Sequence, residues 1–356
     1  MHDVPKPVRN KKHRVYLPLA ALLAVGAILS GVYFLFFSGP SQITEADVFN
    51  KRFARSLDSN IPLYRPAVSN WKELRSELTR LQIPYSALGL PKQLEGAPRQ
   101  FKNNIFSLGF RTADTPVKEA LFYRFMDKAK KDCAVLLIPG TGFDQATKIS
   151  LGKGYHGKIV ETIKPICDLF VLIKPNQGPL SIHNGKKSLD YRVVRVTLLN
   201  DGFSYSITYF VYAQAILQHL REQYQRIGVV GLSQGGEASL IIANLEQPDF
   251  AVVASGYSIL NAEVEFKDLK QTIHPKFRRL NKPENVRQAI GQGKTKYFFS
   301  WGLREKSTYG FEASDEKTCK YFSDGAPEKV TCIFHGGKHV FPLNEVGAFI
   351  REQTKN

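Results

Sequence analysis

The sequence lacks the motifs of several common function classes. It has only four cysteines, and none of them lies in a C-x-x-C motif, which weighs against zinc sites and thioredoxin-like chemistry. It contains no zinc finger, aromatic RNA-binding motif or basic-leucine pattern that would favour nucleic-acid binding. It also has no N-x-[ST] glycosylation sequon, which favours a bacterial envelope over a eukaryotic secretory route. We expect no metal, no cofactor and no nucleic-acid partner.

The four cysteines form two candidate disulfide pairs. Cys319 and Cys332 flank a short passage from helix to strand, and Cys133 and Cys167 each open a predicted strand. Disulfides between these partners and four buried free thiols are both compatible with the sequence, because the choice depends on the redox compartment.

Positive charge is in excess. The formal net charge of this 356-residue chain is +17, and 43% of its residues are hydrophobic. The length and hydrophobic content predict one large domain with appendages. The charge favours contact with anionic surfaces such as phospholipid headgroups or acidic glycans.

The amino terminus predicts a membrane anchor. Residues 1–15 are basic, and residues 16–37 form a charge-free apolar run of about the length that crosses a bilayer. A cleaved signal peptide is the rival interpretation, but the run is long and no A-x-A site follows it. We expect a single-pass signal anchor in the inner membrane. Its amino terminus would be cytoplasmic and the carboxy-terminal domain periplasmic.

The remaining chain divides near residue 100. Residues 38–100 are expected to form a stalk with an amphipathic helix over 68–81, and 101–356 to form the main domain. Residues 104–111 and 117–126 alternate like antiparallel strands. Further apolar strands are predicted at 133–138, 168–173, 227–232, 250–255, 297–301 and 330–334. Helices predicted at 157–163, 204–222, 237–245 and 342–352 imply a mostly parallel sheet, flanked by helices, with an antiparallel edge.

One long basic segment interrupts this rhythm. Residues 257–296 are too long for a plain crossover between strands and carry many lysines and arginines. One interpretation is a helical segment exposed to solvent, with no functional role. The other is a cap-like insertion over the site that attracts an anionic substrate or lipid.

The most informative stretch is Gly231-Leu-Ser-Gln-Gly235. It matches G-x-S-x-G and stands between the predicted strand 227–232 and the predicted helix 237–245. The two glycines would leave room for a tight turn that exposes the Ser233 hydroxyl near the helix N-terminus. Neither of the phosphate-binding glycine motifs can be fitted around Ser233.

With this strand and helix order, residues 101–356 resemble the α/β-hydrolase superfamily. The resemblance implies an α/β-hydrolase fold with a mostly parallel, eight-stranded-type sheet and a catalytic serine at Ser233. It does not identify a substrate, since the fold also serves esterases, lipases, peptidases and acyltransferases.

The resemblance also implies the order serine, acid, histidine. His339 matches the base, in a loop after the last predicted strand and before the last helix, and His335 is its rival. Glu305 follows the penultimate strand, where aspartate is usual in the superfamily, and Asp315 is the alternative acid. Gln234 is implied as one oxyanion-hole donor, and Thr141 or Gly142 as the other.

These expectations combine into a membrane-anchored serine hydrolase. We expect it to cleave or transfer an acyl group through an acyl-enzyme, as an esterase acting on a glycan or lipid of the cell envelope. An acyltransferase or a peptidase on the same fold is an alternative. A non-catalytic binding or scaffold protein that has kept the fold is another.

Overall fold

The computed structural model describes seven segments, residues 93–102, 104–111, 118–142, 144–174, 205–259, 282–305 and 312–355. All of them belong to one compact unit, Ser56–Asn356. The expected anchor at 16–37, the stalk helix at 68–81 and most of the basic insertion at 257–296 lie outside these segments. Among the helices in them, none is both long enough and apolar enough to span a bilayer.

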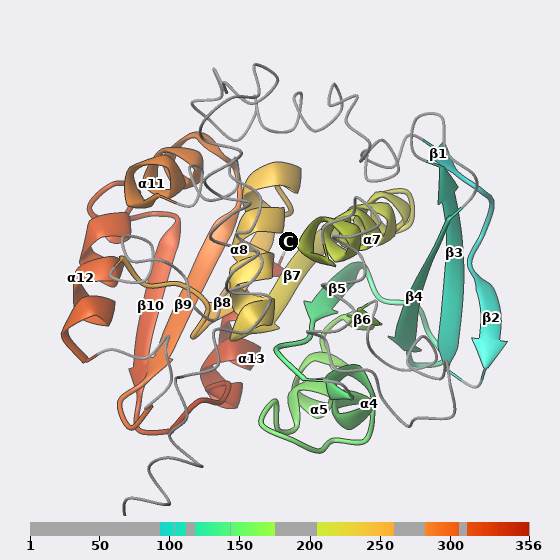
Figure 1. The fold of residues 1–356 in the computed structure, drawn as a ribbon, viewed down its shortest axis with the longest axis horizontal. Coiled ribbons are helices and arrows are strands. Elements are labelled where there is room, and N and C mark those ends of the chain that lie inside the picture. The colour runs from blue at the N-terminus through green and yellow to red at the C-terminus, as the bar shows by residue number, and fades with distance from the viewer. Residues whose placement is uncertain are drawn as a thin grey trace, which may run out of the picture. The chain divides into compact units, whose positions relative to one another are not determined.

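A ten-stranded sheet organises the described segments (Figure 1). Its order is β1-β3-β4-β6-β5-β7-β8-β9-β10, with β2 beside β3. The strands from β6 to β10 along this order are parallel, and β1 to β4 form the antiparallel edge. The bounds are β1 Gln93–Leu94, β2 Arg99–Lys102, β3 Ile105–Arg111, β4 Lys118–Phe125, β5 Cys133–Ile138, β6 Asp168–Leu172, β7 Arg226–Leu232, β8 Phe250–Ala254, β9 Lys296–Gly302 and β10 Val330–His335.

Two short strands enlarge the sheet beyond the expected eight. β1 and β2 both pair with β3, so the sheet begins at Gln93, inside the segment that the sequence assigns to the stalk. Their sequences, QL and RQFK, are too short and too polar to show a hydrophobic alternation. These two segments become strands because they pair with the apolar strand β3.

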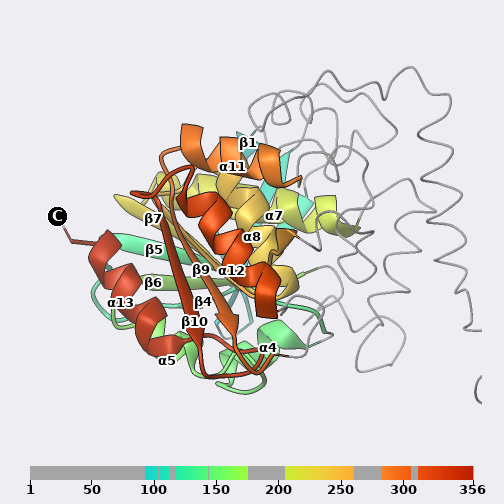
Figure 2. The same cartoon turned by 90° about the vertical axis from the view of Figure 1, so that its left-hand side faces the viewer.

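Helices cover both faces of the sheet (Figure 2). The helices α7 (Tyr205–Arg221), α8 (Gln234–Glu246), α11 (Pro283–Gln292) and α12 (Glu312–Ser323) contribute to one hydrophobic core. The helices α4 (Gln145–Ser150), α5 (Ile159–Ile163) and α13 (Leu343–Gln353) contribute to the other. The sequence predicts α5, α7, α8 and α13 to within a few residues. It gives no bounds for α4, α11 or α12, although α11 lies within the helical excursion expected at 257–296.

Neighbouring residues of each central strand enter opposite cores. In β5, Leu136 and Ile138 belong to the core that α7 and α8 share, whereas Val135 and Leu137 belong to the core that α4 and α5 share. All six residues of β5 are therefore buried. This two-sided burial explains why the parallel strands are continuous apolar runs in the sequence.

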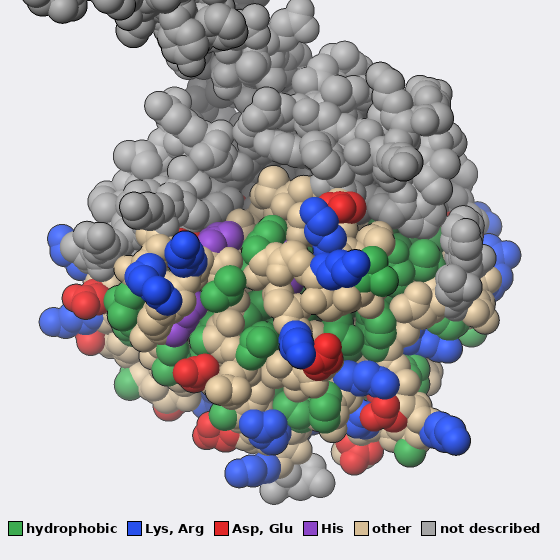
Figure 3. Space-filling model, turned by 90° about the horizontal axis from the view of Figure 1, so that it is seen from below, with side chains coloured by type: hydrophobic (Ala, Val, Ile, Leu, Met, Phe, Trp, Pro, Cys, Tyr) green, Lys and Arg blue, Asp and Glu red, His purple; other side chains and the backbone are tan. Residues whose placement is uncertain are grey.

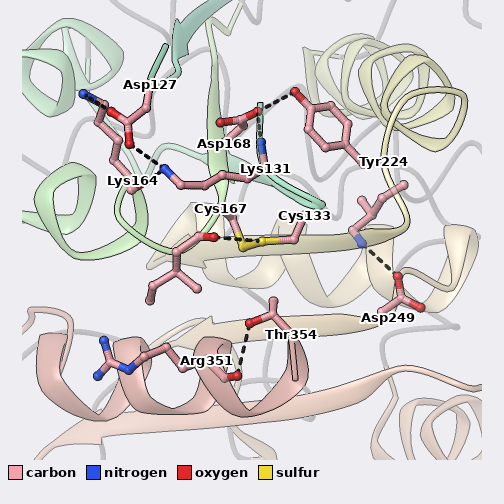
Figure 4. Close-up of a disulfide and its surroundings, with 12 residues drawn as sticks. Asp127, Lys131, Cys133, Lys164, Cys167, Asp168, Tyr224, Asp249, Arg351 and Thr354 are labelled. Carbon is pink, nitrogen blue, oxygen red and sulfur yellow. Dashed lines mark hydrogen bonds and ion pairs between the residues drawn. A yellow bond between two sulfur atoms is a disulfide. The ribbon is translucent and has the colours of Figure 1, made fainter. Parts of the chain in front are cut away.

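Both cysteine pairs are disulfides. Cys133–Cys167 joins the amino end of β5 to the residue before β6, and Cys319–Cys332 joins α12 to β10. Figure 4 shows the first bond beside Asp168, which accepts a hydrogen bond from the Tyr224 hydroxyl at 2.9 Å. The bond and its surroundings lie at the amino ends of the parallel strands. They strengthen the edge of the sheet opposite to the carboxyl ends of these strands.

Charges of both signs are mixed on the face shown in Figure 3. Opposite charges are also paired in and around α4 and α5. Examples are the ion pairs Lys148–Asp144 at 3.1 Å and Lys164–Asp127 at 2.9 Å. On this face the net positive charge of the chain is not gathered into one patch.

Removing a disulfide should destabilise the domain, and slightly more for the bond that closes the longer loop. The Cys133–Cys167 bond spans 34 residues and Cys319–Cys332 spans 13. Loop-closure entropy predicts losses of about 4 and about 3 kcal/mol in the free energy of unfolding. Urea denaturation of C133A/C167A and C319A/C332A measures them. Equal stability of the first variant and the native chain would contradict the prediction.

Candidate active site

Six neighbouring parallel strands of the described sheet end at the same edge. In parallel sheets this carboxyl edge is where ligands bind. The residues that follow these strands, in the order of the sheet, are Lys174 after β6, Gly140 after β5, Ser233 after β7, Ser255 after β8, Glu305 after β9 and His339 after β10. Residues far apart in the sequence are thus brought to one edge.

Ser233 occupies the tight turn that its motif predicts. Its backbone has φ 63° and ψ −129°, a conformation that is strained for a residue with a side chain. A Cβ atom at Gly231 would lie 2.0 Å from the carbonyl oxygen of Gly235, and one at Gly235 would lie 2.0 Å from that of Ile138. The turn therefore requires glycine at both positions, and the Ser233 N–H donates to the Ala254 carbonyl at 2.9 Å.

Helix α8 begins immediately after this serine. Its residues are all buried, so its N-terminal N–H groups lie in a largely water-excluded setting next to Ser233, which immediately precedes the helix. The N–H of Gln234, the first residue of α8, belongs to the first turn of the helix. Together with the helix dipole, it favours negative charge next to Ser233.

Glu305 and His339 meet at the ends of β9 and β10. Nδ1 of His339 hydrogen-bonds Oε1 of Glu305. The Glu305 side chain is fully buried, whereas the His339 side chain is 25% exposed. A carboxylate that accepts the Nδ1 proton stabilises the tautomer in which Nε2 carries the lone pair. The exposed imidazole can then accept a proton at Nε2.

Backbone contacts hold the two loops that carry this pair. The N–H of Leu303 donates to the His335 carbonyl at 2.9 Å, and the N–H of Arg304 donates to the Gly337 carbonyl at 3.0 Å. A Cβ atom at Gly302 would lie 2.2 Å from the Lys338 carbonyl oxygen. This close packing brings the loops near enough for a glutamate to reach the imidazole.

Ser255 is a site residue that the sequence does not reveal. Its hydroxyl donates to Oε2 of Glu305 at 2.6 Å, and the N–H of Gly302 donates to the same oxygen at 3.3 Å. Ser255 is fully buried and has φ 44°. From sequence it is only the last residue of the strand predicted at 250–255. The one available signal is its place at the carboxyl end of a parallel strand.

The alternative residues lie elsewhere. Nδ1 of His335 accepts the Gly337 N–H at 3.2 Å, so this histidine packs against its own loop. Asp315 lies near the start of helix α12. Ser233 Oγ forms no hydrogen bond with another residue in the described segments. The structure thus brings Glu305 to His339 and places Ser233 two strands from Glu305 along the sheet.

Three side chains hold the loop after β5. The N–H of Gly140 donates to Nε2 of His156 at 3.0 Å, and Lys174 Nζ donates to the Gly140 carbonyl at 2.9 Å. The Tyr155 hydroxyl donates to the Thr141 carbonyl at 3.2 Å. A Cβ atom at Gly140 would lie 1.9 Å from the Tyr155 hydroxyl oxygen, so only glycine fits. This loop carries Thr141 and Gly142, the donors expected from the sequence.

Burial keeps two of these supporting groups, His156 and Tyr155, neutral. Burial and the Lys174 charge lower the pKa of His156 to about 3, so its Nε2 stays an acceptor at ordinary pH. Burial raises the pKa of Tyr155, so its hydroxyl stays a donor. No motif in the sequence marks these two residues.

An added methyl group at the turn around Ser233 should destabilise the fold. Gly235→Ala would place Cβ against the backbone of β5, which cannot move without disturbing the sheet. We expect a loss of at least about 2 kcal/mol in the free energy of unfolding. Gly336→Ala is the matched control, since a Cβ atom there would meet nothing within 4 Å. Thermal unfolding of the two variants makes the comparison, and equal melting temperatures would refute the steric account.

Comparisons with known proteins identify solved structures of similar architecture. No family model matches the chain, and no curated protein matches its sequence. A Bacteroides fragilis structure described as a candidate acetyl xylan esterase matches at TM-score 0.52 with 17% identity, covering 82% of both chains. The acetyl xylan esterase of Paenibacillus sp. R4 matches at TM-score 0.47 with 14% identity, covering 84% of this chain and 98% of that one. Only the first score exceeds 0.5, and with the strand order it shows that the chain has the α/β-hydrolase fold.

Proposed function

We propose that this chain is a serine hydrolase that cleaves an acyl ester through an acyl-enzyme on Ser233. The observation that carries the proposal is the hydrogen bond between His339 and the buried carboxylate of Glu305, on the same sheet edge as the Ser233 turn. A strained serine and a carboxylate-bound imidazole on the same edge of the sheet are the parts that nucleophilic acyl transfer needs.

The reaction would proceed in two balanced steps. Ser233 Oγ attacks the ester carbonyl carbon and gives its proton to Nε2 of His339. The C–O bond then breaks, and the departing alcohol takes that proton. In the second step water attacks the acyl-enzyme and gives a proton to His339, which returns it to Ser233 Oγ as the acid leaves. Glu305 stabilises the imidazolium in both steps without taking the proton.

The negative charge of each tetrahedral intermediate requires two donors. The N–H of Gln234 at the start of α8 is one, and the N–H of Thr141 is the other, with that of Gly142 next to it. The hydrogen bonds at Gly140 and Thr141 support this assignment, because they fix the loop before substrate arrives. A fixed loop needs no reorganisation when the oxyanion forms.

An acylated glycan is the substrate class that we propose first. The fold match to a structure described as a candidate acetyl xylan esterase supports it. So does the net charge of +17, which favours an anionic partner such as an acidic envelope glycan or lipid.

We also propose that residues 16–37 anchor the domain outside the cytoplasmic membrane. Both disulfides support this placement, since such bonds persist in oxidising compartments. Alkaline phosphatase fused to the carboxy terminus should be active in intact cells. A fusion that is inactive there, with a cytoplasmic reporter active at the same position, would refute the placement.

Kinetics on p-nitrophenyl acetate test the catalytic assignment. Ser233→Ala should abolish turnover, and Glu305→Gln should lower kcat/KM by about 10³- to 10⁴-fold, because the amide no longer stabilises the imidazolium. Glu316→Gln is the matched control, since Glu316 is an exposed residue of α12. Glu305→Gln activity within about threefold of the native value would exclude Glu305 as the acid.

A further inference from the structure

A buried lysine next to the site takes no part in the proton transfers above. Lys174 follows β6, and only 1% of its surface is exposed, so it cannot contact substrate directly. Placing an ammonium group in a protein interior is costly unless it is well bonded. Its contacts therefore indicate its purpose.

Lys174 connects the two segments that carry the proposed oxyanion donors. Its Nζ donates to the Gly140 carbonyl at 2.9 Å and to Oε1 of Gln234 at 2.6 Å. The same nitrogen lies 5.2 Å from the centroid of the Tyr209 ring, within the range of a cation–π contact. The loop after β5 and the first residue of α8 are thus tied to one cation.

The geometry of the peptide bond transmits this contact to Thr141. The described chain contains no cis peptide bond, so the Gly140 carbonyl and the Thr141 N–H point in opposite directions from one rigid plane. Holding the carbonyl on Lys174 turns the Thr141 N–H away from the lysine. A cation on the carbonyl oxygen also polarises the same peptide and makes its N–H a stronger donor.

We propose that Lys174 is a positioning residue: it ties together the two segments that carry the oxyanion donors and polarises the peptide of the Thr141 donor. The inference rests on the proposed function, because it assigns Thr141 and Gln234 their role in an acyl transfer. It adds a charged group that acts through two backbone segments and does not touch the substrate.

The charge on Lys174 can change near neutral pH. Burial lowers its pKa to about 7. Its titratable neighbours are His156, on the N–H side of Gly140, and the Tyr209 phenol, and no carboxylate of the described residues pairs with it. The cation is present below this pKa and is lost as pH rises through it, leaving a neutral amine that polarises the peptide less.

Lys174→Met tests the positioning role on p-nitrophenyl acetate. We expect kcat to fall about 10²-fold, as for the loss of one oxyanion donor, while KM changes by less than about threefold. Lys153→Met is the control, since Lys153 is an exposed lysine two residues before Tyr155. A kcat equal to that of the control would overturn the inference.

The pH dependence of activity distinguishes the positioning role of Lys174 from a purely structural role in packing. The kcat/KM of the native enzyme should fall to a lower plateau as pH rises through about 7, and Lys174→Met should lack this fall. Gln234→Glu places a carboxylate on the ammonium and should move the fall to higher pH. An unmoved fall in Gln234→Glu would overturn the inference, even where Lys174→Met does not fold by circular dichroism. A native enzyme without Ser233-dependent hydrolysis would instead refute the proposed function.

Discussion

The close approach of backbone to backbone beneath Ser233 is the constraint on which the site depends. Gly235 lies against the carbonyl of Ile138, and Gly231 lies against the carbonyl of Gly235. Gly256 packs in the same way on Gly236. Without side chains at these points, the start of α8 lies directly on the ends of β5, β7 and β8. The serine is held in a strained turn because the sheet around it leaves no other path for the chain.

Groups of opposite charge flank this turn along the sheet. Two strands away on one side, the buried carboxylate of Glu305 holds His339 and is itself held by Ser255. Two strands away on the other side, Lys174 binds the loop that follows β5 and the side chain of Gln234. A proton acceptor thus stands on one side of Ser233 and a cation on the other. An attacking hydroxyl needs this polarity, since its proton leaves in one direction while negative charge develops on the carbonyl oxygen.

The parts of the site that the sequence predicts are those with a local signature. The motif around Ser233 requires particular glycines within five residues, and the positions of Glu305 and His339 follow from the order of strands and helices. Ser255, Lys174, Tyr155 and His156 have no such signature, because their partners are distant in sequence. Continuous apolar runs revealed the parallel core but not β1 and β2, which take their conformation from pairing with β3. Features fixed by neighbouring residues can be predicted from a single sequence, whereas contacts between distant residues cannot.

The central claim is that Ser233 is a nucleophile activated by its surroundings. It is tested most directly by treating the folded protein with a fluorophosphonate and locating the modified residue by peptide mass spectrometry. The account predicts one phosphonylated residue, Ser233, and no modification after the protein has been unfolded in urea. A folded protein that stays unmodified, or that is modified at another serine, would contradict it.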